Sequence, residues 1–372
     1  MMSGPLTYDA FRARVRFPAL DGLRALAIFG VLLHHTRGAP FVRLHGYRGV
    51  WVFFVLSGFL ITTLALRQES QLGRLDLRAF AIRRVFRIMP LYYLILGAYL
   101  IGVLVFGLEP HAERLREHLS AFMLYSSEFS ILQSGFHIPF GQSWSLGIEE
   151  KFYLAWPIVA FWPLRHSRHR IPITLGLIGT TAVLMVGSGV LAQMWGSYTD
   201  ILIGCLLAQL LHERKTYDRL ALLGRKDVAW ALVIALAVGT LSTGTGTQIG
   251  ERLYSLLAAT VVVGLVTSEG GPTSLLTSGW LMRLGAWSYA IYLTHTLCID
   301  IVGRWIPPGH TGDVLTLPAA LALDVPLCWL LHVYLERPLI QWGRELSHRV
   351  QFTTSAPAPN AVPDYVPSPQ ME

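Results

Sequence analysis

The sequence has 372 residues, of which 53% are hydrophobic and only 14% are charged, and its mean hydropathy is +0.47. A soluble globular domain carries about 25% charged residues, so this composition excludes an ordinary soluble protein and indicates a membrane protein. The net charge of +7 could suggest nucleic acid, but most Lys and Arg lie in alternate segments between apolar stretches. That distribution follows the positive-inside rule, and we therefore expect no nucleic-acid partner.

Apolar segments that approach the width of a bilayer recur along almost the whole chain. We therefore predict an all-α polytopic membrane bundle of about ten transmembrane helices. The more polar segment 119–134 predicts a partial or re-entrant helix, which would bring the number of spans to eleven. The ten predicted spans cover residues 19–36, 50–67, 87–107, 145–164, 171–191, 197–212, 228–243, 251–267, 283–303 and 314–335.

The charged segments between the spans determine the expected orientation. When both termini are placed in the cytoplasm, the cytoplasmic segments contain most of the Lys and Arg, so we predict a multi-pass protein of the inner (plasma) membrane. No small-residue cleavage site follows the first span, which we expect to remain as a helix. We predict a cytoplasmic segment at 1–18, a transmembrane domain at 19–338 and a cytoplasmic tail at 339–372, disordered from about residue 353 because it is proline-rich.

The first predicted span contains the most informative pair of residues, Arg24 and His35. An ionisable side chain inside a membrane span is costly and usually marks a functional site. A helix turns by about 100° per residue, so eleven steps place both side chains on one face, about 16 Å apart along the axis. His34 falls about 80° from that face. The spacing therefore favours His35 as a general base on the same stripe as the Arg24 cation.

Three arginines, Arg83, Arg84 and Arg87, end the loop that we expect between the second and third spans. Arg84 and Arg87 are three residues apart and would be neighbours on one helical face. Such a cluster can bind phosphates through bidentate hydrogen bonds, or it can anchor the chain at the cytoplasmic membrane surface. Taken alone, the residues favour anchoring. Pro90 fits the first turn of the following helix or a local kink.

The fourth predicted span begins with a row of polar residues. Ser145, Glu149 and Tyr153 recur at four-residue intervals and are expected on one helical face. The adjacent charges Glu149, Glu150 and Lys151 need a partner or a polar cavity inside an apolar span. A carboxylate at this place could orient and polarise a histidine base. It could equally belong to an internal ion pair that only holds helices together, and the residues leave both interpretations open.

Two further spans contain polar positions. Ser288, Tyr292 and His295 share one stripe of the ninth span, which suits a channel for a polar substrate or hydrogen bonds between helices. In the second span, Ser57 and Gly58 are best explained by close packing against a neighbouring helix. The three cysteines lie in separate spans without metal-binding spacing, so we expect neither a metal site nor a disulfide.

Six motifs follow one another in a defined order: LDGLR with a histidine eleven residues after its arginine, VFFVLSGFLI, RRVFRIMPLY, WSLGIEEKFYL, SYAIYLTH and a terminal ERP. In this order they resemble the acyltransferase-3 family of multi-spanning membrane acyltransferases. The resemblance covers about residues 18–338, and it rests on the order of the motifs because each motif alone is weak.

The resemblance implies an acyl-CoA-dependent O-acyltransferase. The acyl group, usually acetyl from acetyl-CoA, would pass to a hydroxyl of a sugar, a cell-surface glycan or a glycosylated small molecule. Acyl-CoA would be a donor substrate, and no tightly bound cofactor is implied. Many relatives carry an additional extracytoplasmic domain, so this chain is expected either to complete the transfer itself or to hand the acyl group to a partner protein.

The resemblance also implies roles for the basic residues. The essential histidine of the family matches His35, and the basic residue paired with it matches Arg24. The RxxR pair of the family matches Arg84 and Arg87, and we expect Arg83 to assist them in binding the donor.

The remaining motif residues match as well, with one departure. The family carboxylate falls on Glu149, and the histidine of a YLxH-like motif falls on His295. Lys151 stands where a glutamine commonly follows the two glutamates, and it places a cation beside Glu149 and Glu150.

We expect a mechanism in which the arginines hold the nucleotide end of the donor at the cytoplasmic surface. His35 then acts as general base on the acceptor hydroxyl near the outer end of the first span, or, as a less favoured alternative, carries the acyl group itself. Glu149 would orient or charge the imidazole, while Ser145, Tyr153 and the stripe of His295 would line the pocket.

The main alternative is a secondary transporter or exporter of a lipid-linked or sugar substrate. Buried arginine, histidine and glutamate would then serve as relay or substrate-binding residues. The sequence contains no inverted repeat that would support this class of protein.

Overall fold

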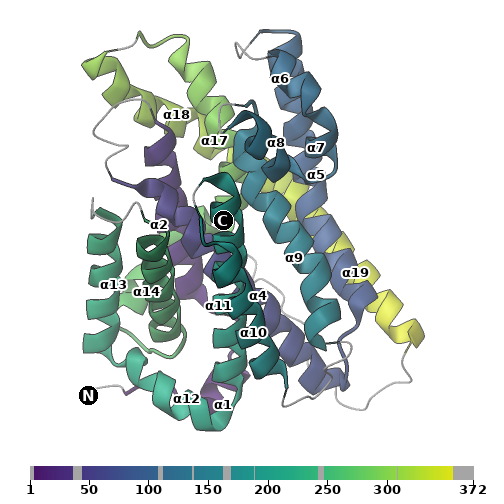
Figure 1. The fold of residues 1–372 in the computed structure, drawn as a ribbon, viewed down its shortest axis with the longest axis vertical. Coiled ribbons are helices and arrows are strands. Elements are labelled where there is room, and N and C mark those ends of the chain that lie inside the picture. The colour runs from purple at the N-terminus through teal and green to yellow at the C-terminus, as the bar shows by residue number, and fades with distance from the viewer. Residues whose placement is uncertain are drawn as a thin grey trace.

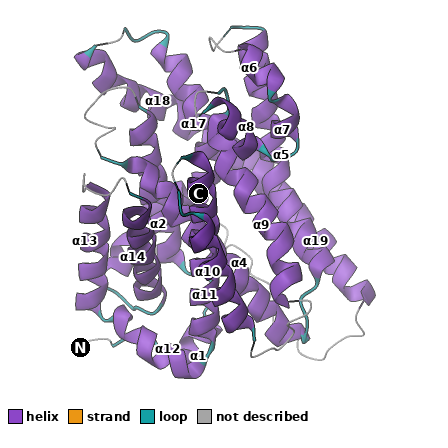
Figure 2. Ribbon diagram, viewed as in Figure 1, coloured by secondary structure: helices purple, strands orange, loops and turns teal. Residues whose placement is uncertain are grey.

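The computed structural model describes residues 4–36, 44–107, 112–135, 138–161, 169–187, 189–241, 247–307 and 309–354. Throughout these residues the chain consists of helices, turns and connecting loops, as Figure 2 shows. The predicted all-α class is therefore confirmed.

A helix coincides with each of the ten predicted spans, and the ninth is divided by a short break. The long helices are α2 (Pro18–His35), α4 (Gly49–Leu72), α5 (Leu77–Leu104), α9 (Trp144–Phe161), α10 (Arg170–Leu184), α11 (Val190–His212), α13 (Lys226–Leu241), α14 (Gln248–Val266), α16 (Gly279–Ala286) with α17 (Ser288–Gly303), and α18 (His310–Leu331). A π-helical turn, His332–Glu336, joins α18 to α19 (Arg337–Thr354).

Shorter helices gather at the two ends of the bundle (Figure 1). At one end lie α6 (Ala112–Glu117), α7 (Leu119–Met123) and α8 (Ser127–Ser134), and at the other lie α1 (Tyr8–Ala13) and α12 (Arg214–Leu220). A further short helix, α15 (Pro272–Leu276), precedes α16, and 3-10 turns occupy Gly46–Arg48, Gly141–Ser143 and Ala221–Gly224.

Five helical segments of the described residues are long and apolar enough to cross a membrane by themselves. They are Gly46–Leu72, Leu77–Leu104, Val190–His212, Gln248–Val266 and Asp313–Gln351. Together with the other apolar helices they form a polytopic bundle, and the protein is a multi-pass membrane protein. The segment 119–134 forms two short helices, α7 and α8, and no single span.

The arginine cluster does not end a loop, as the sequence predicted, but lies inside α5. This helix begins at Leu77, and the side chain of Asp76 caps it by accepting a hydrogen bond from the Ala79 amide at 3.0 Å. An N-cap of this kind satisfies one of the free amides of the first turn, and arginine is a good helix former. Pro90 consequently falls in the helix interior, where it removes one backbone hydrogen bond.

Small residues bring the central helices into backbone contact. A Cβ atom added at Gly58 of α4 would overlap the carbonyl oxygen of Ile201 in α11, and one at Gly204 would overlap the carbonyl oxygen of Val55. Such contacts let two helices approach closely inside a membrane, where the hydrophobic effect does not drive association. The packing role predicted for Gly58 is confirmed.

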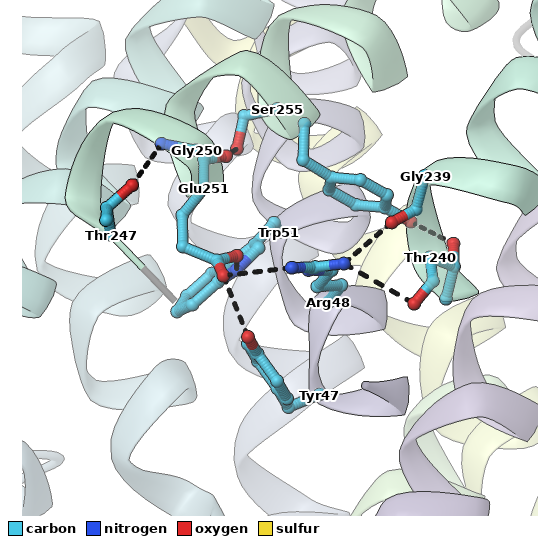
Figure 3. A network of polar contacts seen from close by, with 10 residues as sticks. Tyr47, Arg48, Trp51, Gly239, Thr240, Thr247, Gly250, Glu251 and Ser255 are labelled. Carbon is cyan, nitrogen blue, oxygen red and sulfur yellow. Dashed lines mark hydrogen bonds and ion pairs between the residues drawn. The ribbon is translucent and has the colours of Figure 1, made fainter. Parts of the chain in front are cut away.

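Several buried charges outside the cavity described below are paired with one another. Arg48, which is fully buried, donates to the carbonyl oxygen of Gly239 at 2.6 Å and lies 3.4 Å from Oε1 of Glu251 (Figure 3). Tyr47 and Trp51 also donate to the Glu251 carboxylate, at 2.7 and 2.8 Å. A buried charge is tolerated only when its hydrogen bonds are satisfied, so this network fixes α14 to the start of α4.

The N-terminal segment is held against the bundle by hydrogen bonds to its backbone. The amide of Leu6 donates to the carbonyl oxygen of Thr267 at 2.7 Å, and the hydroxyl of Tyr217 donates to the carbonyl oxygen of Leu6 at 2.8 Å. Burial raises the pKa of Tyr217 to about 12, so this donor keeps its proton at neutral pH. At the other terminus α19 extends to Thr354, and the tail predicted to be disordered lies almost entirely outside the described residues.

Candidate active site

A cavity lies between α2, α4, α5, α9 and the α16–α17 pair. Polar side chains from helices far apart in the sequence converge on it. Most of the predicted site residues line this one cavity, namely Arg24, Arg84, Arg87, Ser145, Glu149, Tyr153, Ser288 and Tyr292. The sequence predicted the helical face of each group, and the fold brings the faces together.

Three guanidinium groups give one part of the cavity a positive charge. Arg84 and Arg87 come from α5, and Arg24 comes from α2. The guanidinium of Arg84 lies over the ring of Tyr153, 4.5 Å from the ring centroid. Arg24 lies 4.0 Å from Asp21, one turn earlier in α2. Guanidinium groups bind phosphate through paired hydrogen bonds, so this part of the cavity suits an anionic ligand.

Two carboxylates, Glu149 and Glu150, line the same cavity. The hydroxyl of Tyr153 donates to Oε2 of Glu149 at 2.8 Å, one helical turn away. Lys151 faces the opposite direction, towards α8, where its ammonium group lies 2.5 Å from Oε1 of Glu128. Lys151, which stands in place of the expected glutamine, therefore pairs with Glu128 and not with Glu149 or Glu150. The cations that line the cavity beside these two carboxylates are the arginines.

A row of hydroxyl groups continues along the cavity wall. Ser145 and Tyr292 are hydrogen-bonded at 2.7 Å, and the Tyr292 hydroxyl donates to the carbonyl oxygen of Gln142 at 2.8 Å. Because Tyr292 has a single proton to donate, Ser145 is the donor in the contact between the two hydroxyls. The ring of Tyr292 also lies 5.7 Å from the ring of His295, so Tyr292 connects the cavity with a pair of histidines.

His35 of α2 and His295 of α17 face each other at the end of this row. Their ring centroids lie 4.8 Å apart, with the ring planes at 73°. Nδ1 of His35 contacts the carbonyl oxygen of Val31 at 2.9 Å. A carbonyl oxygen can only accept, so in the neutral ring Nδ1 carries the hydrogen and Nε2 of His35 keeps its lone pair. That nitrogen is consequently ready to accept a proton.

His34 lies on a different side of α2. Its ring is 5.3 Å from the ring of Tyr47, whereas His35 contacts His295. The two histidines therefore have different neighbours: His35 faces α17, and His34 faces the 3-10 turn that precedes α4.

Comparison with known families gives a direct match. Residues 17–333 match the acyltransferase domain of the acyltransferase-3 family. The match covers well over half of the chain and includes five of the six motifs described above, since the ERP motif at residues 336–338 lies just beyond it. The chain belongs to the acyltransferase-3 family.

Several known proteins are similar to this chain. The putative peptidoglycan O-acetyltransferase YrhL of Bacillus subtilis is 29% identical over 367 residues, which cover 90% of this chain and 56% of YrhL. The peptidoglycan O-acetyltransferase OatA of Listeria monocytogenes is 30% identical over 316 residues, 76% of this chain and 49% of that protein. The O-acetyltransferase OatA of Staphylococcus aureus is 26% identical over 359 residues, with 88% and 57% covered.

The chain thus spans about half the length of the relatives it matches. No solved structure matches the chain.

For two residues, Glu149 and Arg83, the position in the structure does not agree with the role expected from the acyltransferase-3 resemblance. Glu149 was expected to orient His35, but its carboxylate accepts a hydrogen bond from Tyr153, and the group that orients His35 is the carbonyl of Val31. The reason is that the two side chains lie at different depths of the bundle, Glu149 beside the arginines and His35 beyond Tyr292.

Arg83 was expected to assist Arg84 and Arg87, and it also lies elsewhere. Its guanidinium contacts Ser347 of α19 and Gln68 of α4, both at 3.4 Å. Since α5 continues through the cluster, a step of one residue turns Arg83 about 100° from Arg84, away from the cavity.

Sequence reasoning missed three polar residues that line the cavity. Ser57 was attributed to packing alone, Glu150 was noted only as a charge in need of a partner, and Tyr289 was not considered. The signal for Glu150 was present, because a second carboxylate in a membrane span needs a polar environment. Nothing in the sequence distinguishes Tyr289 from an ordinary interfacial tyrosine.

Proposed function

We propose that this protein transfers an acyl group, acetyl from acetyl-CoA, to a hydroxyl of a sugar, a cell-surface glycan or a glycosylated small molecule. One observation carries the proposal. A single path of polar residues leads from an arginine-lined cavity, which suits a phosphorylated donor, to a histidine whose Nε2 lone pair is free to act as a base. The names of the relatives, which include peptidoglycan O-acetyltransferases, support a glycan acceptor.

The donor binds through its charges. Arg84 and Arg87, together with Arg24, hold the phosphates of the CoA donor by charge-assisted hydrogen bonds. The thioester arm then extends past Ser145 and Tyr292 towards His35. Acyl-CoA is a substrate in this scheme, and it leaves as CoA after each turnover.

Chemistry takes place at His35. Nε2 of His35 removes the proton of the acceptor hydroxyl while the hydroxyl oxygen attacks the thioester carbon. The new C–O bond forms, the C–S bond breaks, and the departing thiolate takes up the proton to give free CoA. The products are therefore the O-acyl ester and CoA-SH, with no net proton released.

The proposed topology follows from the distribution of Lys and Arg. We place the protein in the plasma membrane with both termini in the cytoplasm, so the arginines meet the donor from the cytoplasmic side. His35 then lies towards the outer half of the membrane, where an extracytoplasmic acceptor or an acyl-accepting partner protein can reach it.

The test is CoA release from radiolabelled acetyl-CoA by detergent-purified protein, with a soluble N-acetylglucosamine oligomer as acceptor probe and the label traced into the oligomer. We expect release and labelling by the wild type, and neither by His35→Ala at equal protein and equal thermal stability. Wild-type protein that binds acetyl-CoA but releases no CoA, with the oligomer or with membranes of the producing cell, would contradict the proposal and favour a transport function.

A further inference from the structure

We propose that His295 accepts a hydrogen bond from the Nε2–H group of His35 once His35 has taken up the acceptor proton, so that two imidazoles share one proton. His295 is in this view a positioning residue for the catalytic base. The inference rests on the acyltransferase function proposed above, because it concerns the protonated base formed during transfer.

The first observation is an unsatisfied nitrogen. His295 is 1% exposed, and its Nε2 atom is buried without a hydrogen-bond partner among the described residues. Buried polar atoms are nearly always paired, because an unpaired one loses its hydrogen bond to water without replacement. Nε2 of His295 is therefore available to a hydrogen-bond partner that forms only during the reaction.

The second observation concerns which kind of partner this nitrogen can take. Nδ1 of His295 lies 2.8 Å from the carbonyl oxygen of Tyr292 and 3.2 Å from that of Ile291. Both oxygens can only accept, so Nδ1 carries the hydrogen and Nε2 holds a lone pair. Only a hydrogen-bond donor can satisfy Nε2 of His295.

The third observation is that His35 becomes such a donor only when it is protonated. In the neutral ring its single hydrogen is on Nδ1 and is directed to Val31, as described above. Protonation adds a second hydrogen, on Nε2, and the ring of His35 already touches the ring of His295 at a centroid distance of 4.8 Å. Nε2 of His295 therefore gains a hydrogen-bond donor only after His35 has taken the proton from the acceptor hydroxyl.

Other polar groups near the two histidines already donate their protons elsewhere or face away from His295. The hydroxyl of Tyr292 gives its proton to Gln142, and that of Tyr47 gives its proton to Glu251. His34 lies beside His35, with a ring separation of 5.4 Å, and turns towards Tyr47. His45 borders Tyr47 at 6.0 Å. Among the described residues, His35 is the group in ring contact with His295 that can gain a new N–H during catalysis.

This arrangement lowers the barrier by stabilising charge that appears during the reaction. The proton leaves the acceptor hydroxyl, binds Nε2 of His35, is shared with Nε2 of His295 while the C–O bond forms, and passes to the thiolate as the C–S bond breaks. A hydrogen bond to a charged group is stronger than one between neutral groups, and here it exists only after proton transfer. Its loss should reduce turnover and leave donor binding unchanged.

Two polar substitutions of His295 test the inference because they place an acceptor at different positions. The side-chain oxygen of His295→Gln can reach the place of Nε2, whereas the shorter His295→Asn can replace only Nδ1 and its bond to the Tyr292 carbonyl. We expect His295→Gln to keep most of the wild-type kcat and His295→Asn to lose about tenfold or more, the ratio expected for a charge-assisted hydrogen bond. The KM for acetyl-CoA should stay unchanged in both.

His212→Asn is the matched control. His212 has the same local geometry, with Nδ1 on the carbonyl oxygen of Ala208 at 2.7 Å and a buried unpaired Nε2, but its aromatic neighbour is Phe11. Its substitution should leave kcat unchanged.

The inference fails if folded His295→Asn retains wild-type kcat, if His295→Gln loses as much kcat as His295→Asn, or if the loss appears in KM. If His295→Asn does not fold, His295→Gln decides the test. A low kcat of folded His295→Gln would then contradict the proposal. Inactivity of the wild type would instead contradict the proposed function.

Discussion

Lys151 forms an ion pair with Glu128, at 2.5 Å, although two other carboxylates immediately precede it in the sequence. Glu128 belongs to α8 and its side chain is 1% exposed, so it depends on Lys151 for its neutralisation. The same ammonium group donates to the carbonyl oxygen of Tyr125 at 2.5 Å. Lys151 therefore joins the short helices at one end of the bundle to α9, and it does so on the side of α9 that faces away from the cavity.

Lys151→Met should destabilise the protein and leave the chemistry intact. Removing the ammonium group strands a buried carboxylate, which we expect to cost about 2–3 kcal/mol of unfolding free energy. Thermal unfolding in detergent measures the loss. Glu128→Leu combined with Lys151→Met removes both charges and should recover much of the stability. A large rise in the KM for acetyl-CoA in Lys151→Met would show that Lys151 acts in the cavity instead.

His35→Ala and His34→Ala should differ sharply in activity. His35 supplies the proposed base, so its removal should reduce acetyl transfer by about 10²–10⁴-fold with folding intact. His34 packs against Tyr47 and should be replaceable with substantial activity left. Rates of CoA release from labelled acetyl-CoA decide the matter, and an equal loss in both variants would refute the assignment by helical face.

Arg87→Ala should weaken donor binding. Arg87 lines the cavity with Arg84, and the loss of a charge-assisted contact to phosphate should raise the KM for acetyl-CoA roughly tenfold. Arg83→Ala is the control from the same helix, because Arg83 contacts Ser347 and Gln68 and should leave this KM unchanged. A fall in kcat alone in Arg87→Ala would argue against a phosphate-binding role.

Gly58→Val should disturb the contact between α4 and α11. The added side chain would overlap the backbone of Ile201, and we expect a loss of at least about 2 kcal/mol or failure to fold. Gly97→Ala, at a position with open space around it, should be neutral or stabilising. Expression level and thermal unfolding of the two variants give the comparison, and tolerance of Gly58→Val would mean that the two helices can separate.

The sequence by itself determined the class of the fold, the positions of the membrane helices and the polar face of each helix. These properties are local. Hydrophobic length predicts a span, and the turn of about 100° per residue predicts that Ser145, Glu149 and Tyr153 share one face, as they do in the cavity. The same rule predicts that His35 and His34 point in different directions, and in the structure they have different neighbours.

Only the tertiary structure decided which faces meet. Lys151 pairs with Glu128, His35 meets His295, and Glu149 lies with the arginines, because interhelical distances depend on where small residues permit close approach. A Cβ atom at Gly285, for instance, would overlap the backbone of Asp21, and this contact holds α16 against α2. Periodicity along one helix contains no information about the neighbour that such a contact admits, so the charge pairs and the histidine pair could not be predicted from the sequence alone.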